Sequence, residues 1–184
     1  MKLTLSKRFY GLVAALAICS AIVPSAASAT TATGSFSVTA SVPKNCSLSA
    51  PTLAFGSYDV VGTQATSPLD GSSTLSIKCT KGTGAAVYVQ GGLGSNSASA
   101  SGSCAVATCT RAMTDGTDFL SYDLYTVAYT TVWSPTATSG TSVFSFDFSS
   151  SSATQTATIS GEIPAGEDVG VGSYTDSITM TANF

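Results

Sequence analysis

Carboxylates are the first group of side chains in this sequence that could do chemistry. The sequence contains no histidine, which excludes Ser-His-Asp and Cys-His arrangements for nucleophilic catalysis. Asp115, Asp118 and Asp123, or Glu167 with Asp168, could form a carboxylate pair or a calcium loop. The first three lack the alternate-residue spacing of a calcium-binding loop, so we expect all five to be solvated carboxylates in turns.

Aromatic residues form a second group with chemical potential: Tyr122, Tyr125, Tyr129 and Trp133. Such a group could form a platform on which sugar rings stack. Because aromatic residues are also common in strands, packing in the core or across strands explains them better. No glycine-rich phosphate loop precedes a helix. We therefore predict no enzymatic activity, no cofactor and no small-molecule substrate.

Cysteines form a third group, and one of the five, Cys19, lies in a segment that we expect to be removed. The remaining four are an even number, which in an exported chain indicates disulfides. Cys104 and Cys109 lie close together in a Gly/Ser/Ala-rich loop, so we predict a bridge between them. That leaves Cys46 to pair with Cys79. These spacings, without histidine, fit a zinc site poorly.

Residues 1–29 are predicted to be a signal peptide. A basic start is followed by an apolar run over residues 12–23 and by Ala27-Ser28-Ala29, the small-x-small pattern that signal peptidase recognises. The run is shorter than the roughly 20 apolar residues needed to span a bilayer, which argues against a retained anchor. Cleavage before Thr30 leaves a chain long enough for one domain with a hydrophobic core.

The charge of the processed chain excludes one class of partner. It keeps four cations, Lys44, Lys78, Lys81 and Arg111, against ten carboxylates, which gives a net charge of about −6. Four scattered cations in an acidic chain cannot form the basic surface that nucleic-acid binding needs. Ser, Thr, Gly and Ala dominate the rest, a composition that suits an all-β extracellular protein with a neutral, hydroxyl-rich surface.

Short runs of alternating apolar residues, separated by Gly, Ser and Asp, follow the signal peptide. They lie at residues 48–55, 75–79, 85–89, 119–133, 141–148 and 157–163. Period-two alternation is typical of strands with one buried face, and no window after residue 30 has helical periodicity. The spacing of the runs predicts an all-β sandwich of two sheets rather than a βαβ fold.

The longest alternation lies near the start of the processed chain, where every second residue is small or apolar and the others are hydroxylated. Its small or apolar face comprises Ala32, Gly34, Phe36, Val38, Ala40 and Val42. A second alternation reaches the final residue, and its apolar face comprises Tyr174, Ile178, Met180, Ala182 and Phe184. The chain thus has a spare strand at its front and ends on a strand, so we expect the spare strand to enter another molecule.

Five short motifs, in this order, resemble the spore coat protein U domain, a family that includes subunits of archaic, Csu-type chaperone–usher pili. They are Thr110-Arg111-Ala112-Met113, Leu120-x-Tyr122-x-Leu124-Tyr125, Thr131-Val132-Trp133, Gly161-Glu162-Ile163-Pro164-Ala165-Gly166 and Gly172-Ser173-Tyr174-Thr175-Asp176. The likeness covers essentially the whole chain after the signal peptide. Two positions depart from the family pattern: Ser134-Pro135 stands where a glycine is usual, and Glu162 where a basic residue is expected.

The resemblance implies an incomplete immunoglobulin-like β-sandwich that lacks its seventh strand and is completed by a donor strand from another subunit. An apolar groove then stays open beside the C-terminal strand, where Tyr174 to Phe184 would contact a periplasmic chaperone. An outer-membrane usher is the second expected partner. In the fibre, the N-terminal extension of the next identical or related pilin replaces the chaperone. Accordingly, residues 30–43 are expected to be the donor extension, and residues 44–184 the pilin domain.

The function implied by the resemblance is that of a structural subunit of a surface pilus, exported through the periplasm and supporting adhesion and biofilm formation. One alternative is that residues 32–42 are the first strand of a complete, self-contained sandwich. Other functions compatible with the sequence are a secreted spore or cell coat protein and an adhesive binding module. A tip adhesin normally carries a second, ligand-binding domain, which we do not expect here.

Overall fold

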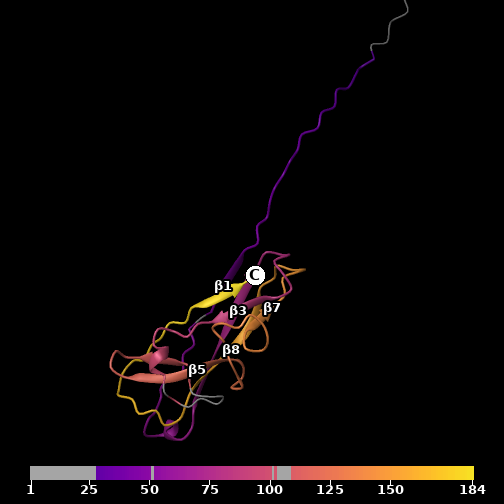
Figure 1. Cartoon of the computed structure of the whole chain (residues 1–184). Helices are drawn as coiled ribbons and strands as arrows, with labels where there is room; N and C mark the ends of the chain where they lie inside the picture. The colour runs from indigo at the N-terminus through magenta and orange to yellow at the C-terminus, as the bar shows by residue number, and fades with distance from the viewer. Residues whose placement is uncertain (1–27, 51, 101, 103–108) are drawn as a thin grey trace, which may run out of the picture. The chain divides into compact units, whose positions relative to one another are not determined.

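The computed structural model describes residues 28–50, 52–100, 102 and 109–184. These residues divide into two units, an N-terminal one that ends at Ala40 and a folded one, Ser41–Phe184. The described part of the N-terminal unit, residues 28–40, has no assigned helix or strand, whereas the folded unit is all-β (Figure 1). In the described part of the chain no helix has the length and apolar character needed to cross a membrane.

The described residues of the folded unit form nine strands and two short 3₁₀ turns. The strands are β1 (Cys46–Ser49), β2 (Leu69–Cys79), β3 (Val87–Gly91), β4 (Arg111–Thr114), β5 (Phe119–Val127), β6 (Thr131–Val132), β7 (Phe144–Phe146), β8 (Gln155–Ile163) and β9 (Met180–Asn183). The turns are η1 (Thr63–Ala65) and η2 (Ser97–Ser99). The prediction of a strand-rich chain without α-helical periodicity is confirmed over the described residues.

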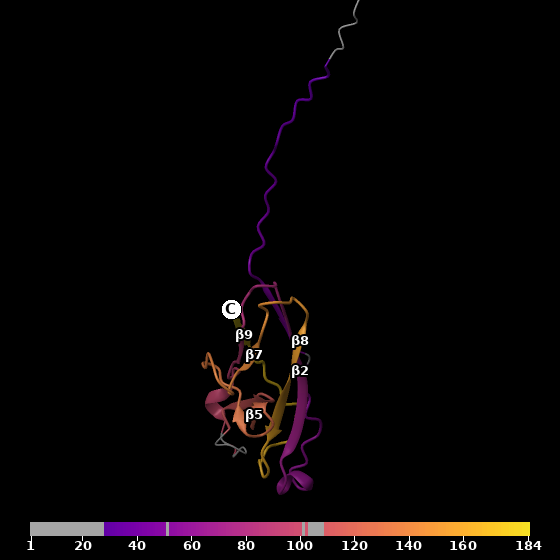
Figure 2. The same ribbon diagram turned by 90° about the vertical axis from the view of Figure 1, so that its right-hand side faces the viewer.

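The strands form two antiparallel sheets that face each other (Figure 2). The six-stranded sheet has the order β1-β2-β8-β5-β4, and β6 pairs with β5. The three-stranded sheet has the order β7-β3-β9. The longest ladder joins β2 to β8, from Leu69 opposite Ile163 at one end to Ile77 opposite Gln155 at the other. This two-layer arrangement is that of an immunoglobulin-like sandwich, as predicted.

The core lies between the two sheets and is built by the alternation seen in the sequence. Its buried members include Leu75, Ile77, Val87, Val89, Leu120, Leu124, Trp133, Phe144, Phe146, Phe148, Ile159 and Ile163. Within a strand these residues are two or four apart, because successive side chains of a strand point to opposite faces. The sheets therefore hold each other through one shared apolar layer.

The predicted strands differ from those of the structure at four places. Ala85 is exposed and precedes β3, and residues 52–55 lie outside any strand although their side chains alternate. Of residues 141–148, only Phe144–Phe146 pair in a sheet. The strand β4 was not among the predicted runs, because its four residues are too few to show a period.

Candidate functional site

An apolar groove runs along the folded unit between two lengths of chain that are far apart in the sequence. Residue 50 and residues 52–60, which follow β1, form the N-terminal wall, and residues 169–180, which lead into β9, form the C-terminal wall. The groove consists of two cavities of about 730 and 490 Å³. They adjoin, because both are lined by Phe55 and Tyr174.

Each wall continues a strand at the edge of a sheet. β1 is the first strand of the six-stranded sheet, and β9 is the last strand of the three-stranded sheet. β9 pairs with β3 along one side, with Gly91 opposite Met180 and Tyr88 opposite Asn183. An edge strand presents backbone N–H and C=O groups along its other side, so the groove offers a place where a further strand can pair.

The predicted alternation of the C-terminal residues is present in the C-terminal wall. Tyr174, Ile178, Met180 and Ala182 are half-buried and pack against the core. The first three line the groove, whereas Ala182 is not among the residues that line its two cavities. Phe184 follows the end of β9 and is 55% exposed. The structure therefore brings three of the five predicted residues together at the groove, and their contact with a chaperone stays a prediction.

The floor of the groove is formed by core side chains of the six-stranded sheet and its neighbours: Met113, Leu120, Tyr122, Leu124, Trp133, Ile159 and Ile163. The Trp133 indole N–H donates to the carbonyl of Val89 at 2.9 Å, and the ring packs edge-to-face on Phe144 with centroids 5.0 Å apart. Tyr122 meets Phe55 of the N-terminal wall in the same way at 6.0 Å. The floor is thus apolar, and Trp133 links it to the three-stranded sheet.

The aromatic residues singled out in the sequence are packing residues, as expected. Tyr122, Tyr125 and Trp133 are buried. Tyr129 is half-buried and packs edge-to-face on Tyr125 at 5.8 Å. Because three of the four rings are inside the protein, they do not form an exposed stacking platform.

Two opposed glycines shape the N-terminal wall. Gly71 of β2 lies directly opposite Gly161 of β8, so the sheet has no side chain at either position. A Cβ atom at Gly71 would lie 3.0 Å from both Leu53 and Phe55, and one at Gly161 would lie 2.8 Å from Phe55. The side chains of the wall therefore occupy the space that the two missing Cβ atoms leave open. The sequence placed Gly161 in a strand but gave no sign of this contact.

A tyrosine hydroxyl anchors the far end of the N-terminal wall. Tyr58 Oη donates to the carbonyl of Pro164 at 2.6 Å and accepts the backbone N–H of Glu167 at 3.1 Å. Pro164 directly follows β8, so this contact ties the wall to the end of the central sheet ladder. Residues 52–55, which lie outside any strand, are thus held by side chains rather than by a sheet ladder.

A polar contact joins the floor to the C-terminal wall. Tyr122 Oη donates to Asp176 Oδ2 at 2.8 Å, and Asp176 Oδ1 accepts the backbone N–H groups of Ser95 at 3.2 Å and Ser177 at 2.8 Å. Burial of the phenol, reinforced by the Asp176 carboxylate, raises the pKa of Tyr122 far above its ordinary value. Sequence reasoning missed this pair, although Asp176 is in phase with Tyr174 and Ile178.

The expectation that all five carboxylates of interest are solvated is wrong for Asp123. Asp123 is 1% exposed and forms an ion pair with Arg111, which is fully buried. The Arg111 guanidinium also donates to the carbonyls of Gly91, Gly92 and Trp133 at 2.8–2.9 Å. The reason is that β5 is buried on both faces from Leu120 to Tyr125, whereas an alternating pattern indicates only one buried face.

The other carboxylates do lie in loops and turns. Asp115 Oδ1 accepts the backbone N–H groups of Thr117 and Asp118 at 2.9 Å, and these hydrogen bonds lower the pKa of Asp115. Asp118 is half-buried and accepts the N–H of Gly170 at 2.8 Å. Glu167 is also half-buried, while Asp168 is exposed. Among the described residues, no group of three or more His, Cys, Asp or Glu side chains could hold a metal ion.

The predicted donor residues belong to a stretch that is exposed throughout. Residues 28–45 have no helix or strand, and every one of them is exposed. The large apolar side chains Phe36, Val38 and Val42 are 86, 81 and 79% exposed, respectively. Ala32, Gly34 and Ala40 of the same face are exposed as well. Their role as a donor strand stays a prediction.

The predicted bridge between Cys46 and Cys79 is confirmed. It joins the first residue of β1 to the last residue of β2, which lie directly opposite each other. Cys109 is buried and disulfide-bonded. Its predicted partner, Cys104, lies outside the described residues, so that pairing stays a prediction. The signal peptide likewise lies outside them up to residue 27.

Comparisons with known proteins bear on the family. The chain is similar to the crystal structure of the CsuC–CsuE chaperone–tip adhesion subunit pre-assembly complex from archaic chaperone–usher Csu pili of Acinetobacter baumannii, with 22% identity and a TM-score of 0.49. That match covers 78% of this chain but only 40% of the other chain. No curated protein sequence matches the chain. The family model of the Spore Coat Protein U domain matches residues 32–181, a range that includes both walls of the groove. The chain therefore belongs to the Spore Coat Protein U domain family.

Proposed function

We propose that this protein is a structural, non-enzymatic subunit of a surface pilus that is assembled by donor-strand exchange on the chaperone–usher route. One observation carries the proposal: the same chain has an apolar groove between two sheet edges and, separately, a segment with an exposed, alternating apolar face. The segment has the period of the missing strand, and the groove has the two edges that such a strand would join.

Insertion of the donor segment would bury apolar side chains and add backbone hydrogen bonds, and both contributions favour a tight contact between subunits. Burial of Phe36, Val38 and Val42 contributes about 1.5–3 kcal/mol each by area. A row of backbone hydrogen bonds to the edge strands adds about 1 kcal/mol each, before the cost of ordering the donor segment. Because the donor and the acceptor are different surfaces of one chain, the contact does not close on itself and builds a filament.

The same geometry explains why such a subunit would need a chaperone. An open groove leaves the half-buried apolar side chains of its walls and the edge backbone groups accessible, which makes the free subunit prone to aggregation. We propose that a periplasmic chaperone covers the groove after export and that an outer-membrane usher exchanges it for the next identical or related pilin. Adhesion and biofilm formation follow as functions of the assembled fibre at the cell surface.

A charged residue on the apolar face of the donor segment tests the proposal. Phe36→Asp places an unpaired carboxylate in an apolar groove, so the donor strand should not seat and fibres should be lost. Ser37→Asp introduces the same charge on the hydroxylated face and is the matched control, which should retain fibres. The measurement is a count of surface fibres together with co-purification of the subunit with its chaperone.

Two results contradict the proposal. If the Phe36→Asp subunit loses chaperone binding together with fibres, residues 32–42 belong to a self-contained sandwich. If it assembles normally, the segment is no donor. Recovery of the wild-type chain in a spore or cell coat fraction, without fibres, would instead favour the coat function.

A further inference from the structure

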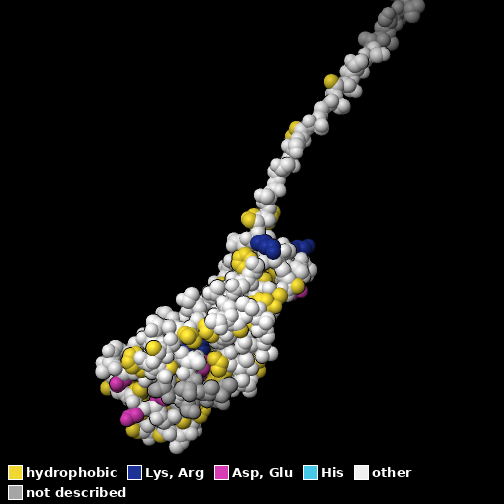
Figure 3. Space-filling model, viewed as in Figure 1, with side chains coloured by type: hydrophobic (Ala, Val, Ile, Leu, Met, Phe, Trp, Pro, Cys, Tyr) yellow, Lys and Arg dark blue, Asp and Glu magenta, His cyan; other side chains and the backbone are white. Residues whose placement is uncertain are grey.

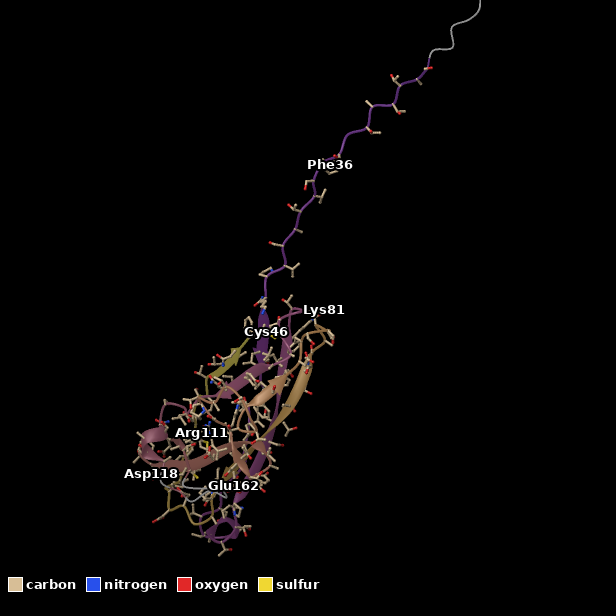
Figure 4. All side chains as sticks on the ribbon, turned by 45° about the vertical axis from the view of Figure 1, so that its right-hand side comes forward. Phe36, Cys46, Lys81, Arg111, Asp118 and Glu162 are labelled. Carbon is tan, nitrogen blue, oxygen red and sulfur yellow. A yellow bond between two sulfur atoms is a disulfide. The ribbon has the colours of Figure 1, made fainter. Side chains whose placement is uncertain are left out.

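The exposed cations of the folded unit gather at one end of the sandwich. Lys44, Lys78 and Lys81 are all exposed, and we call this group the basic end. They are neighbours because Cys46 lies opposite Cys79 and the N–H of Thr80 donates to the carbonyl of Asn45 at 2.8 Å. Figure 3 shows the dark blue side chains close together there, and Figure 4 labels Lys81 beside Cys46.

Most exposed or half-exposed carboxylates lie at the opposite end. We call this group the acidic end: Asp59, Asp115, Asp118, Glu167 and Asp168. Asp59 lines the larger cavity together with Gly170, whose N–H donates to Asp118. The Tyr58 hydroxyl joins this end to Pro164, next to the Leu69–Ile163 end of the β2–β8 ladder. Since Lys78 and Cys79 are at the other end of β2, about 30 Å of strand separates the two groups.

The remaining charged side chains do not reverse this polarity. Asp70 is exposed and lies next to Leu69, at the acidic end of β2, and Asp176 is half-buried in the C-terminal wall. Arg111 is buried and pairs with Asp123, so the pair adds no net charge to either end. Asp147 lies near the lysines, because the adjacent Phe148 accepts the N–H of Gly82 at 2.7 Å. Three cations against the Asp147 carboxylate and, in a protein that ends at Phe184, the C-terminal carboxylate still leave the basic end positive.

We propose that the basic end of one copy of this chain docks on the acidic end of the preceding copy, as a second contact between successive subunits. The inference rests on the proposed donor-strand exchange and adds a surface outside the groove. Opposite charges on facing surfaces steer association and reject the wrong orientation more than they add affinity. The docked ends therefore select the direction in which the donor segment is inserted.

The connection between the donor segment and the folded unit makes this contact possible. From Val42 to Cys46 the chain spans at most about 14 Å, so the body of the donor subunit must lie close to the groove end that receives Val42. The C-terminal wall begins beside the acidic end, where residues 169–174 line the larger cavity with Asp59. It ends toward the basic end, where Asn183 lies opposite Tyr88.

Only one direction of insertion brings opposite charges together. If the donor runs antiparallel to the C-terminal wall, Val42 lies at the acidic end, and Lys44 of the incoming subunit meets the carboxylates there. If it runs parallel, the lysines of the incoming subunit meet the lysines of the acceptor. The antiparallel direction is therefore favoured by charge, and the parallel one is opposed by it.

A charge reversal tests the docked ends. The variant K44E/K78E/K81E changes exposed side chains, so its fold should be retained. We expect residues 30–184 carrying it to polymerise about tenfold more slowly than the wild type at about 50 mM NaCl, and this difference should vanish near 500 mM. The matched control, D147K, raises the positive charge of the same end and should not slow polymerisation. Light scattering after release from the chaperone gives the rates.

A peptide of residues 30–43 separates this inference from the proposed function, because the peptide carries no charged side chain. It should bind the groove of the wild type and of the triple variant equally, at both salt concentrations. If the peptide binds but the triple variant polymerises at the wild-type rate at low salt, the proposed docking of the two ends is wrong and donor-strand exchange stands. If the peptide does not bind at all, donor-strand exchange itself is wrong.

Discussion

Arg111 is predicted to be the most sensitive charged position of the folded unit. Arg111→Met leaves the Asp123 carboxylate buried without its cation and removes the donors to the carbonyls of Gly91, Gly92 and Trp133. Loss of one partner of a buried ion pair costs about 3–5 kcal/mol. Because a domain is stable by only about 5–15 kcal/mol, this is a large share of the total.

Urea unfolding of residues 30–184 measures the effect. With an m-value of about 2 kcal/mol/M, a loss of about 4 kcal/mol lowers the unfolding midpoint by about 2 M. Lys78→Met removes an exposed cation from β2 and is the control, expected within about 0.5 kcal/mol of the wild type.

The double variant R111M/D123L shows whether the cost comes from the unpaired charge. It removes both charges of this buried pair, so it should be more stable than Arg111→Met alone. A urea midpoint for Arg111→Met within about 0.5 M of that of the Lys78→Met control would refute the reasoning, because loss of the Arg111 cation would then not destabilise the folded state.

Two further predictions concern the groove. Gly161→Ala places a Cβ atom 2.8 Å from Phe55, so it should displace the N-terminal wall and weaken binding of the 30–43 peptide about tenfold, as measured by titration. Thr158→Ala, at an exposed position of β8, is the control. Equal peptide affinities of the two variants would show that the close approach of Phe55 to Gly161 does not shape the groove. Because the pKa of Tyr122 is raised in the folded state, its contribution to stability is complete below pH 10 and is lost as the pH rises above that value, where the unfolded phenol ionises first. Unfolding followed from pH 9 to 11.5 should therefore show a shallower loss of stability in Tyr122→Phe, and identical slopes would contradict the pKa assignment.

Much of the fold follows from the period of the sequence. The alternation of Leu75, Ile77 and Cys79, and of Phe144 and Phe146, predicts buried strand faces that the structure confirms. The Cys46–Cys79 bridge also followed, because the spacing of the cysteines left one economical pairing.

What the sequence could not show depends on contacts between distant segments. Asp123 is in the solvent phase of β5, but packing on the second face buries it against Arg111. Glu162 is buried on β8 for a similar reason, opposite Asp123 of β5. Gly71 and Gly161 lie opposite each other and beside Phe55 because of the register between β2 and β8, and a local sequence pattern does not reveal strand register. Periodicity assigns one buried face per strand, and it is silent where a strand has two.

The position of the Cys46–Cys79 bridge has a mechanical consequence. In the proposed fibre, tension on a subunit would enter through the residues before Cys46, at the very start of β1. The covalent bond passes that load directly to the end of β2, the longest strand, which is paired with β8 along nine residues. Force then runs along this ladder and shears many hydrogen bonds at once, so β1 is spared from being peeled off the sheet one bond at a time.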